Sequence, residues 1–230
     1  MQRLVIYCAD VGSIKQGNFA WARIEVPASE VEEERGGATE IVELVGAVAG
    51  DLASGVPVAL GFECPLFVPV PTSAQRLGTA RPGDGTRPFS AGAGTGALVT
   101  GLVQAAWVLK ELRRQRPDDA VFLDWGAFAA ADRGLFLWEA FVTAKAKSAT
   151  HVGDAIVAVS CFKAALPDPR SSSTVTAERP LSLVGAAALW AGWTDDLALL
   201  HAPCLVLRAA PTEAARKSIT GRASTVAESI

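Results

Sequence analysis

The sequence predicts an α/β fold, with a mixed sheet of five strands flanked by helices on both faces. Two observations carry this prediction. Two apolar runs near the N-terminus, residues 3–9 and 18–26, are separated by a short turn and can pair as an antiparallel hairpin. After them, segments of helical periodicity alternate with short apolar runs, which is the order that gives parallel strands joined by helices.

The segments that follow the hairpin each have their own signal. Residues 27–38 are polar and rich in glutamate, so they predict a loop or a poor third strand. Apolar residues recur at helical spacing over about 39–54, and Gly55 is a suitable C-terminal stop. The apolar run 56–63 predicts a buried strand, and residues 65–93, rich in proline, glycine and arginine, predict a long loop.

Helices and strands continue to alternate over residues 95–165. A strong helix is expected over about 95–116, and Pro117 ends it. Strands are expected at 120–125 and 135–142, and a helix at about 150–165.

The chain divides into one main domain and an extension. Residues 1–166 form the main domain, and residues 167–210 are expected to pack on it as an extension with a helix at about 181–192 and a strand at 204–209. The last residues, 211–230, are small and polar, which predicts a disordered tail.

Composition limits the classes of function. Half of the 230 residues are hydrophobic, and the formal charge of −3 provides no general basic field for nucleic acid, so binding would need a local patch. Four cysteines without C-x-x-C spacing disfavour zinc and suit a reducing, cytoplasmic compartment. No apolar run reaches about 18 residues, so we expect no membrane partner.

Carboxylates stand at the ends of several predicted strands. Asp10 ends the first strand, Glu63 follows an apolar strand in the stretch GFECP, and Glu139 lies near the end of a later strand. Asp154 lies three residues after His151 in the first turn of a helix, so both project from one helix face. Carboxylates gathered at a sheet edge repel each other unless a cation or protons compensate, and hard divalent ions take such ligands.

Each of these residues also has a structural interpretation. Asp10 can stabilise a turn, and Asp154, in the first turn of a helix, can interact favourably with the helix dipole. His151 and Glu139 can simply be surface residues. Glu63, directly after an apolar strand, is expected to be partly buried and then needs a partner. The candidate partners are the arginines of the long loop: Arg76, Arg81 and Arg87.

In their order along the chain these residues resemble a known family. Asp-x-Gly-Ser begins at Asp10, an acid-x-Pro motif begins at Glu63, Glu139 follows in a later strand, and His-x-x-Asp-Ala begins at His151. The pattern is similar to the ribonuclease H-like superfamily, closest to the predicted nucleases of the domain of unknown function 429 family and more distantly to RuvC-type resolvases. It covers about residues 3–165.

The sequence departs from the family pattern in two places. The acid-x-Pro motif has Glu63 where the family has Asp. The later-strand Glu is usually followed by a proline-containing stretch, but Glu139 is followed by AFVT, so Asp124 is a rival for its role.

The resemblance implies a metal-dependent nuclease. Asp10, Glu63 and Asp154 would bind one or two Mg²⁺ or Mn²⁺ ions, with Glu139 as a further ligand or outer-shell residue. His151 would position water or the scissile phosphate of a nucleic-acid substrate. The phosphate contacts from the long loop would be Arg76, Arg81 and Arg87.

Two other functions stay open. A non-catalytic scaffold of the same fold is compatible with the acidic pI and with the departures at Glu63 and after Glu139. An actin-like nucleotide-binding protein shares the first-strand Asp-x-Gly turn, but such proteins normally duplicate the domain. Trp190 and Trp193 can either cap the core or form a homodimer surface.

Overall fold

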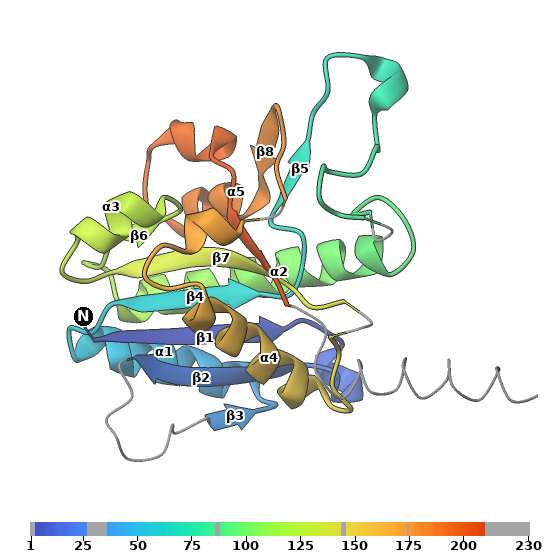
Figure 1. Cartoon of the computed structure of the whole chain (residues 1–230). Coiled ribbons are helices and arrows are strands. Elements are labelled where there is room, and N and C mark those ends of the chain that lie inside the picture. Colours follow the sequence, from blue (N-terminus) through green and yellow to red (C-terminus); the bar gives the residue numbers. More distant parts are fainter. Residues whose placement is uncertain (1–2, 27–35, 86–87, 144–145, 174, 210–230) are drawn as a thin grey trace, which may run out of the picture.

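The computed structural model describes residues 3–26, 36–85, 88–143, 146–173 and 175–209 (Figure 1). Three sequence predictions therefore lie wholly or largely outside the described residues. They are the disordered tail at 211–230, the role of Arg87, and most of the weak segment 27–38.

Within the described residues the main sheet has seven strands, in the order β3-β2-β1-β4-β7-β6, with β9 also paired to β7. The pairings β1–β2 and β2–β3 are antiparallel, and all others are parallel. A mixed sheet that begins with a hairpin is confirmed, although five strands were expected. The strands are β1 (Leu4–Asp10), β2 (Ala20–Val26), β3 (Gly36–Ala38), β4 (Val58–Phe62), β6 (Val121–Phe122), β7 (Leu135–Phe141) and β9 (Leu205–Arg208).

Helices cover both faces of this sheet, because alternate residues of β1 are buried on opposite sides. Val5 and Tyr7 belong to the core under α1, α2 and α5, whereas Ile6 and Cys8 belong to the core under α3 and α4. Figure 1 shows α4 in front of the sheet and α1 and α2 behind it. The helices are α1 (Ile41–Ala53), α2 (Ala93–Gln115), α3 (Trp125–Ala130), α4 (His151–Ala164) and α5 (Leu183–Ala191).

The predicted long loop contains secondary structure of its own. β5 (Phe67–Pro69) pairs antiparallel with β8 (Pro180–Ser182), far away in the chain, and forms a small second sheet. Short strands of this kind carry no periodic signal and depend on a distant partner, so they could not be predicted locally. The short 3₁₀ helices are η1 (Ile14–Gln16), η2 (Ala74–Arg76), η3 (Pro169–Ser172) and η4 (Leu197–His201).

The strand expected at 120–125 is shorter than predicted. β6 ends at Phe122, and Asp124 then caps α3, its Oδ1 accepting a hydrogen bond of 2.7 Å from the backbone N–H of Ala127. An aspartate that satisfies a free N–H group in this way starts a helix rather than continuing a strand.

The C-terminal extension shares the main core. Its strand β9 pairs in parallel with β7, and α5 packs on α2. Trp193 is buried, and its indole N–H donates to the carbonyl oxygen of Leu109 at 2.8 Å. Trp190 is instead exposed. Only one of the two tryptophans therefore caps the core.

In the described part of the chain, no helix is long and apolar enough to cross a membrane. All four cysteines are free thiols.

Candidate metal centre

Asp10 and Glu63 stand side by side at the ends of two neighbouring parallel strands. β1 ends at Asp10, and the backbone N–H of Glu63 donates to the carbonyl oxygen of Ala9 at 2.8 Å, which extends the β1–β4 ladder beyond Phe62. Both carboxylates are mostly buried. Two acids are thereby placed at the same edge of the sheet.

The start of α4 brings a histidine and a third acid to this edge. Thr150 caps the helix, its hydroxyl accepting from the N–H of Gly153 at 3.1 Å. His151 Nδ1 lies 2.6 Å from Asp10 Oδ2, and Asp154 Oδ1 accepts a hydrogen bond of 2.5 Å from the backbone N–H of Ser148. The orientation of Asp154 is therefore set by the turn that precedes the helix.

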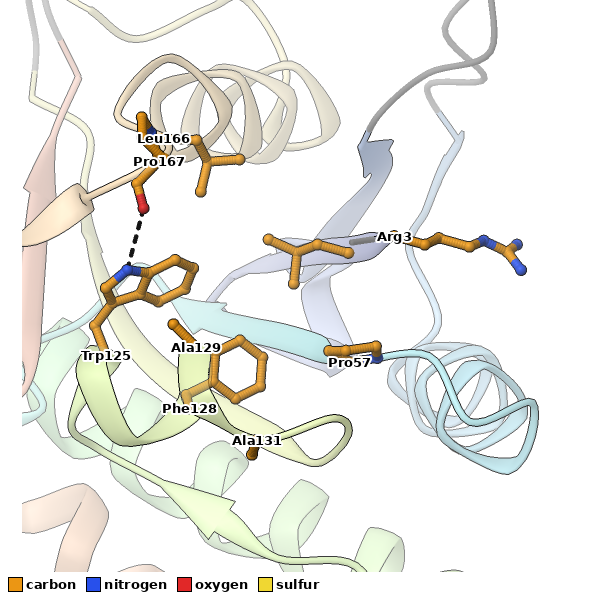
Figure 2. Close-up of a pocket in the computed structure, with 9 residues that line it drawn as sticks. Arg3, Pro57, Trp125, Phe128, Ala129, Ala131, Leu166 and Pro167 are labelled. Carbon is orange, nitrogen blue, oxygen red and sulfur yellow. Dashed lines mark hydrogen bonds between the residues drawn. The ribbon is translucent and has the colours of Figure 1, made fainter. Parts of the chain in front are cut away.

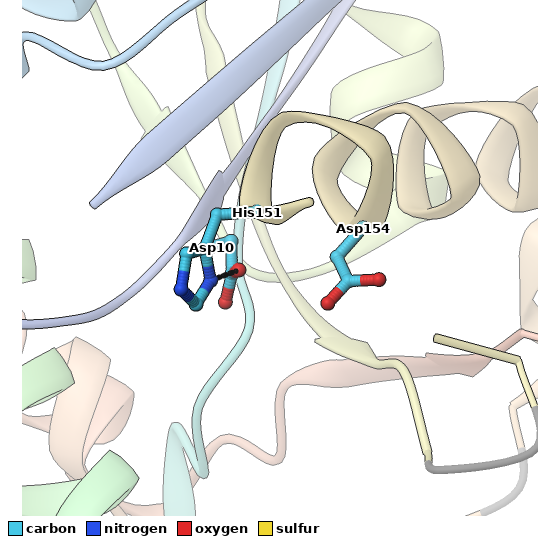
Figure 3. A group of neighbouring side chains, drawn as sticks. All are labelled: Asp10, His151 and Asp154. Atoms are coloured by element: carbon cyan, nitrogen blue, oxygen red, sulfur yellow. Dashed lines mark hydrogen bonds and ion pairs between the residues drawn. The ribbon is translucent and has the colours of Figure 1, made fainter. Parts of the chain in front are cut away.

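Asp10, His151 and Asp154 form a group that can hold a metal ion. One ligand atom from each residue lies within 4.8 Å of the others, and Figure 3 shows the three side chains turned toward a common space. Carboxylate oxygens and imidazole nitrogen are ordinary ligands of divalent ions. Of the predicted metal ligands, Asp10 and Asp154 belong to this group, and His151, predicted to position water or phosphate, is its third member. Glu63 lies beside the group, next to Asp10 at the same sheet edge.

Lys147 is the functional candidate that the sequence did not indicate. Its Nζ lies 3.2 Å from Asp154 Oδ2 and 3.5 Å from Glu63 Oε1, and its side chain is partly exposed. It is an internal counter-ion for these acids. The only signal in the sequence is a lysine four residues before His151, and this spacing has no meaning until the turn is folded.

The electrostatics of the site favour an added cation. Burial, followed by the charge of Asp10, raises the pKa of Glu63 to about 9, although Lys147 opposes the shift. Burial also raises the pKa of Asp10, against the hydrogen bond from His151. Glu63 Oε2 is buried and accepts no hydrogen bond from a donor among the described residues, while a side-chain hydrogen bond with Asp10 adds to the rise of the Glu63 pKa. Burying ionised carboxylates is costly, and a divalent ion would offset that cost.

Glu139 and Arg81, both predicted site residues, form an ion pair with each other. Both are buried, and Arg81 Nη1 and Nη2 donate to the two oxygens of Glu139 at 2.8 and 2.6 Å. The N–H of Leu66 adds a bond of 2.9 Å to Glu139, and Asp84 binds the other side of the guanidinium. This ion pair uses both oxygens of Glu139 and the terminal nitrogens of the Arg81 guanidinium. The loop arginine expected as a partner of Glu63 serves Glu139 instead.

The remaining candidates lie outside the group. Asp124 caps α3, so it does not replace Glu139 as a third acid. Arg76 is exposed in η2, within the loop that projects beyond β5 in Figure 1. Arg87 lies outside the described residues.

A small cavity of about 130 Å³ adjoins the acidic group. The cavity is lined by Glu63 and Lys147, by the paired Arg81 and Glu139, and by the start of α2 at Ala93 and Gly94. α2 can approach the end of β4 closely because Gly101 has no side chain. A Cβ atom at Gly101 would lie only 2.3 Å from Cys64 Sγ. The N-terminal end of this long helix is suited to anions.

A larger cavity, of about 310 Å³, lies at the opposite end of the sheet (Figure 2). It is mainly apolar, and Pro57, Trp125 and Phe128 line it. The indole N–H of Trp125 already donates to the carbonyl oxygen of Pro167 at 3.3 Å, and the side chain of Arg3 points away from the cavity in Figure 2. It offers little for chemistry, so the smaller cavity beside the acids is the better candidate.

Comparisons with protein-family models, curated proteins and solved structures found no match to this chain.

Proposed function

We propose that this chain is a divalent-metal-dependent nuclease with a ribonuclease H-like fold. The observation that carries the proposal is the convergence of Asp10, His151 and Asp154 at the edge where β1 and β4 end. A hairpin followed by parallel strands, flanked by helices, agrees with the fold that the family resemblance implies. Phosphodiester hydrolysis is the reaction for which that family uses carboxylates in this order.

The residues present fit Mg²⁺ or Mn²⁺. Asp10 and Asp154 supply the oxygen ligands that both ions prefer. Three carboxylates face one lysine and one histidine, and Glu63 Oε2 has no partner, so the site is short of positive charge. A bound ion would lower the pKa of water and neutralise charge on a phosphate oxygen.

The side chains around the ion site have separable roles. Asp10 holds His151 through Nδ1, which leaves Nε2 of the partly exposed imidazole to accept a proton from water or to contact phosphate. Lys147, also partly exposed, can place its ammonium against a substrate phosphate, as can the start of α2. These local contacts suit nucleic acid even though the whole chain is acidic.

Cleavage assays test the proposal directly. The purified protein is incubated with Mn²⁺ or Mg²⁺ and labelled branched, hybrid or single-stranded nucleic acids. We expect the wild type to cleave at least one of them and Asp10→Asn to be at least about 100-fold slower, because a ligand and the partner of His151 are altered together.

Asp124→Asn is the matched control for this assay. It removes one carboxylate from the predicted rival position, and asparagine caps a helix as well as aspartate does. Its activity should equal that of the wild type. Cleavage that is equal in Asp10→Asn and the wild type, or absent with both ions on every substrate, contradicts the proposal.

The second candidate is a non-catalytic scaffold, and the position of Lys147 favours it. An ammonium 3.2 Å from Asp154 already supplies one positive charge to the acids. Calorimetry with millimolar Mn²⁺ separates the two candidates. Binding that is lost in Asp10→Asn supports the nuclease, whereas no binding supports the scaffold.

A further inference from the structure

The outward side of α2 is apolar over its middle. Val99, Val103 and Trp107 are exposed large hydrophobic residues at helical spacing, opposite the side where Ala105 and Leu112 are buried. We call these three residues the outer stripe. An ordinary surface helix is polar on its outward side, so a helix that is apolar on both sides calls for a second partner.

The apolar surface continues onto the neighbouring helix. α5 packs against α2, and its Trp190 has 65% of its surface exposed. Lys110, one turn after Trp107, holds its Nζ 5.5 Å from the centre of the Trp190 ring. The outer stripe and Trp190 therefore belong to one patch that spans two helices.

The size of this patch suits the apolar part of a dimer interface of ordinary area. Two partly exposed tryptophans and two valines present roughly 400 Å² of apolar surface, the size at which patches on monomers mark interaction sites. A stable pair of proteins buries about 800 Å² on each side, of which about 65% is apolar in homodimers. The patch therefore supplies roughly 400 of the roughly 520 Å² of apolar surface that such an interface contains on each side, and polar rim residues would supply the rest.

We propose that the outer stripe is the contact between two copies of this chain, with α2 packed antiparallel on its counterpart about a twofold axis at Val103. In this arrangement Trp107 faces Val99 of the second copy, so a large side chain meets a small one. The backbone position of Lys110, whose ammonium lies over Trp190 of its own chain, faces Gly96 of the second copy. A Cβ atom at Gly96 would meet nothing within 4 Å, so no side chain there obstructs the close approach of the two helices.

An exposed hydrophobic residue on another helix lies outside any such stripe. Val42 on α1 has 65% of its surface exposed, but its outward neighbours are Glu43 and Gly46. A single exposed valine is normal on a soluble protein. Val42 therefore serves as the matched control for Val103, whose exposure is 67%.

The test measures the oligomeric state by sedimentation equilibrium over a micromolar concentration series. We expect the wild type to dimerise and Val103→Glu to dimerise at least about 100-fold more weakly, because two like charges would meet on the axis. Val42→Glu should dimerise as the wild type does. Both valines are exposed, so both variants should fold, and circular dichroism checks that they do.

Cross-linking tests the symmetry. A Val103→Cys variant should form a disulfide with its own copy under mild oxidation, because the axis brings the two positions within the roughly 4–7 Å that a disulfide spans between Cα atoms. A Val42→Cys variant should not. A monomeric wild type at all concentrations, or dimerisation unchanged in Val103→Glu, overturns the proposal. Neither result bears on the nuclease, because Asp10, His151 and Asp154 lie outside α2.

Discussion

Two glutamates, Glu63 and Glu139, lie at nearly the same level near the ends of the neighbouring strands β4 and β7, but their surroundings differ. Phe62 of β4 is in register with Glu139 of β7, so Glu63 lies one residue beyond its counterpart. Both follow apolar residues and both are largely removed from water. Glu139 has both oxygens bound by Arg81, whereas Glu63 has Lys147 at 3.5 Å and one oxygen without a partner.

The difference separates a structural carboxylate from one available to a ligand. Burial raises the pKa of both groups, but the guanidinium beside Glu139 acts against the shift and completes its hydrogen bonding. Glu139 thereby attaches the loop that contains Arg81 and Asp84 to the sheet. Glu63 is left short of positive charge at the edge where Asp10 and Asp154 also lie. A buried acid that the protein does not fully pair is the better sign of a cation site.

Removing Arg81, the partner of Glu139, should cause the largest loss in the free energy of unfolding. Arg81→Met leaves Glu139 buried without its cation, and we expect the free energy of unfolding to fall by about 3–5 kcal/mol in urea titrations. Arg76→Met, at an exposed arginine of the same loop, should change it by less than about 0.5 kcal/mol.

If Arg81→Met fails to fold, Glu139→Gln provides the milder measurement. It keeps the shape of the side chain and should cost about 1–3 kcal/mol. Variants of Arg81 and Glu139 that are as stable as Arg76→Met would show that this ion pair contributes nothing.

Glu63 should make the free energy of unfolding depend on pH. The pKa of Glu63 is about 9 in the folded protein and about 4.3 in an unfolded chain. Between these values the folded state holds a proton that the unfolded state has released, so the free energy of unfolding decreases as pH rises. The slope is up to about 1.4 kcal/mol per pH unit.

Glu63→Gln removes this slope. Relative to the wild type, Glu63→Gln should be equally stable near pH 4 and more stable by up to about 5 kcal/mol near pH 8, as measured by urea unfolding. In the wild type, added Mn²⁺ should reduce the slope because a metal ion replaces the proton as the compensating charge. Parallel pH profiles for the two proteins would contradict the assignment.

The smallest expected effect is that of Lys147 on the affinity for Mn²⁺. Lys147→Met removes the ammonium that lies beside Asp154 and Glu63, so Mn²⁺ should bind about 10-fold more tightly in calorimetry. Lys163→Met removes the same charge at the far end of α4 and should leave affinity unchanged. Weaker or equal binding in Lys147→Met would mean that Lys147 does not compete with the metal.

By itself the sequence determined the alternation of helices and strands, the hairpin, and the strand and helix ends that present Asp10, Glu63, His151 and Asp154. Hydrophobic periodicity, caps and stops are properties of neighbouring residues, so they can be seen without a fold. The short strands β5, β8 and β9 depend on partners elsewhere in the chain, and their pairing was therefore beyond such an argument.

Only the tertiary structure decided which acids are paired. Arg81 and Glu139 are 58 residues apart, and Asp10 and His151 are 141 residues apart. Nothing local distinguishes Glu63 from Glu139, because each is a carboxylate after apolar residues. Their roles diverge because the chain folds Arg81 against one and places only the partly exposed Lys147 beside the other.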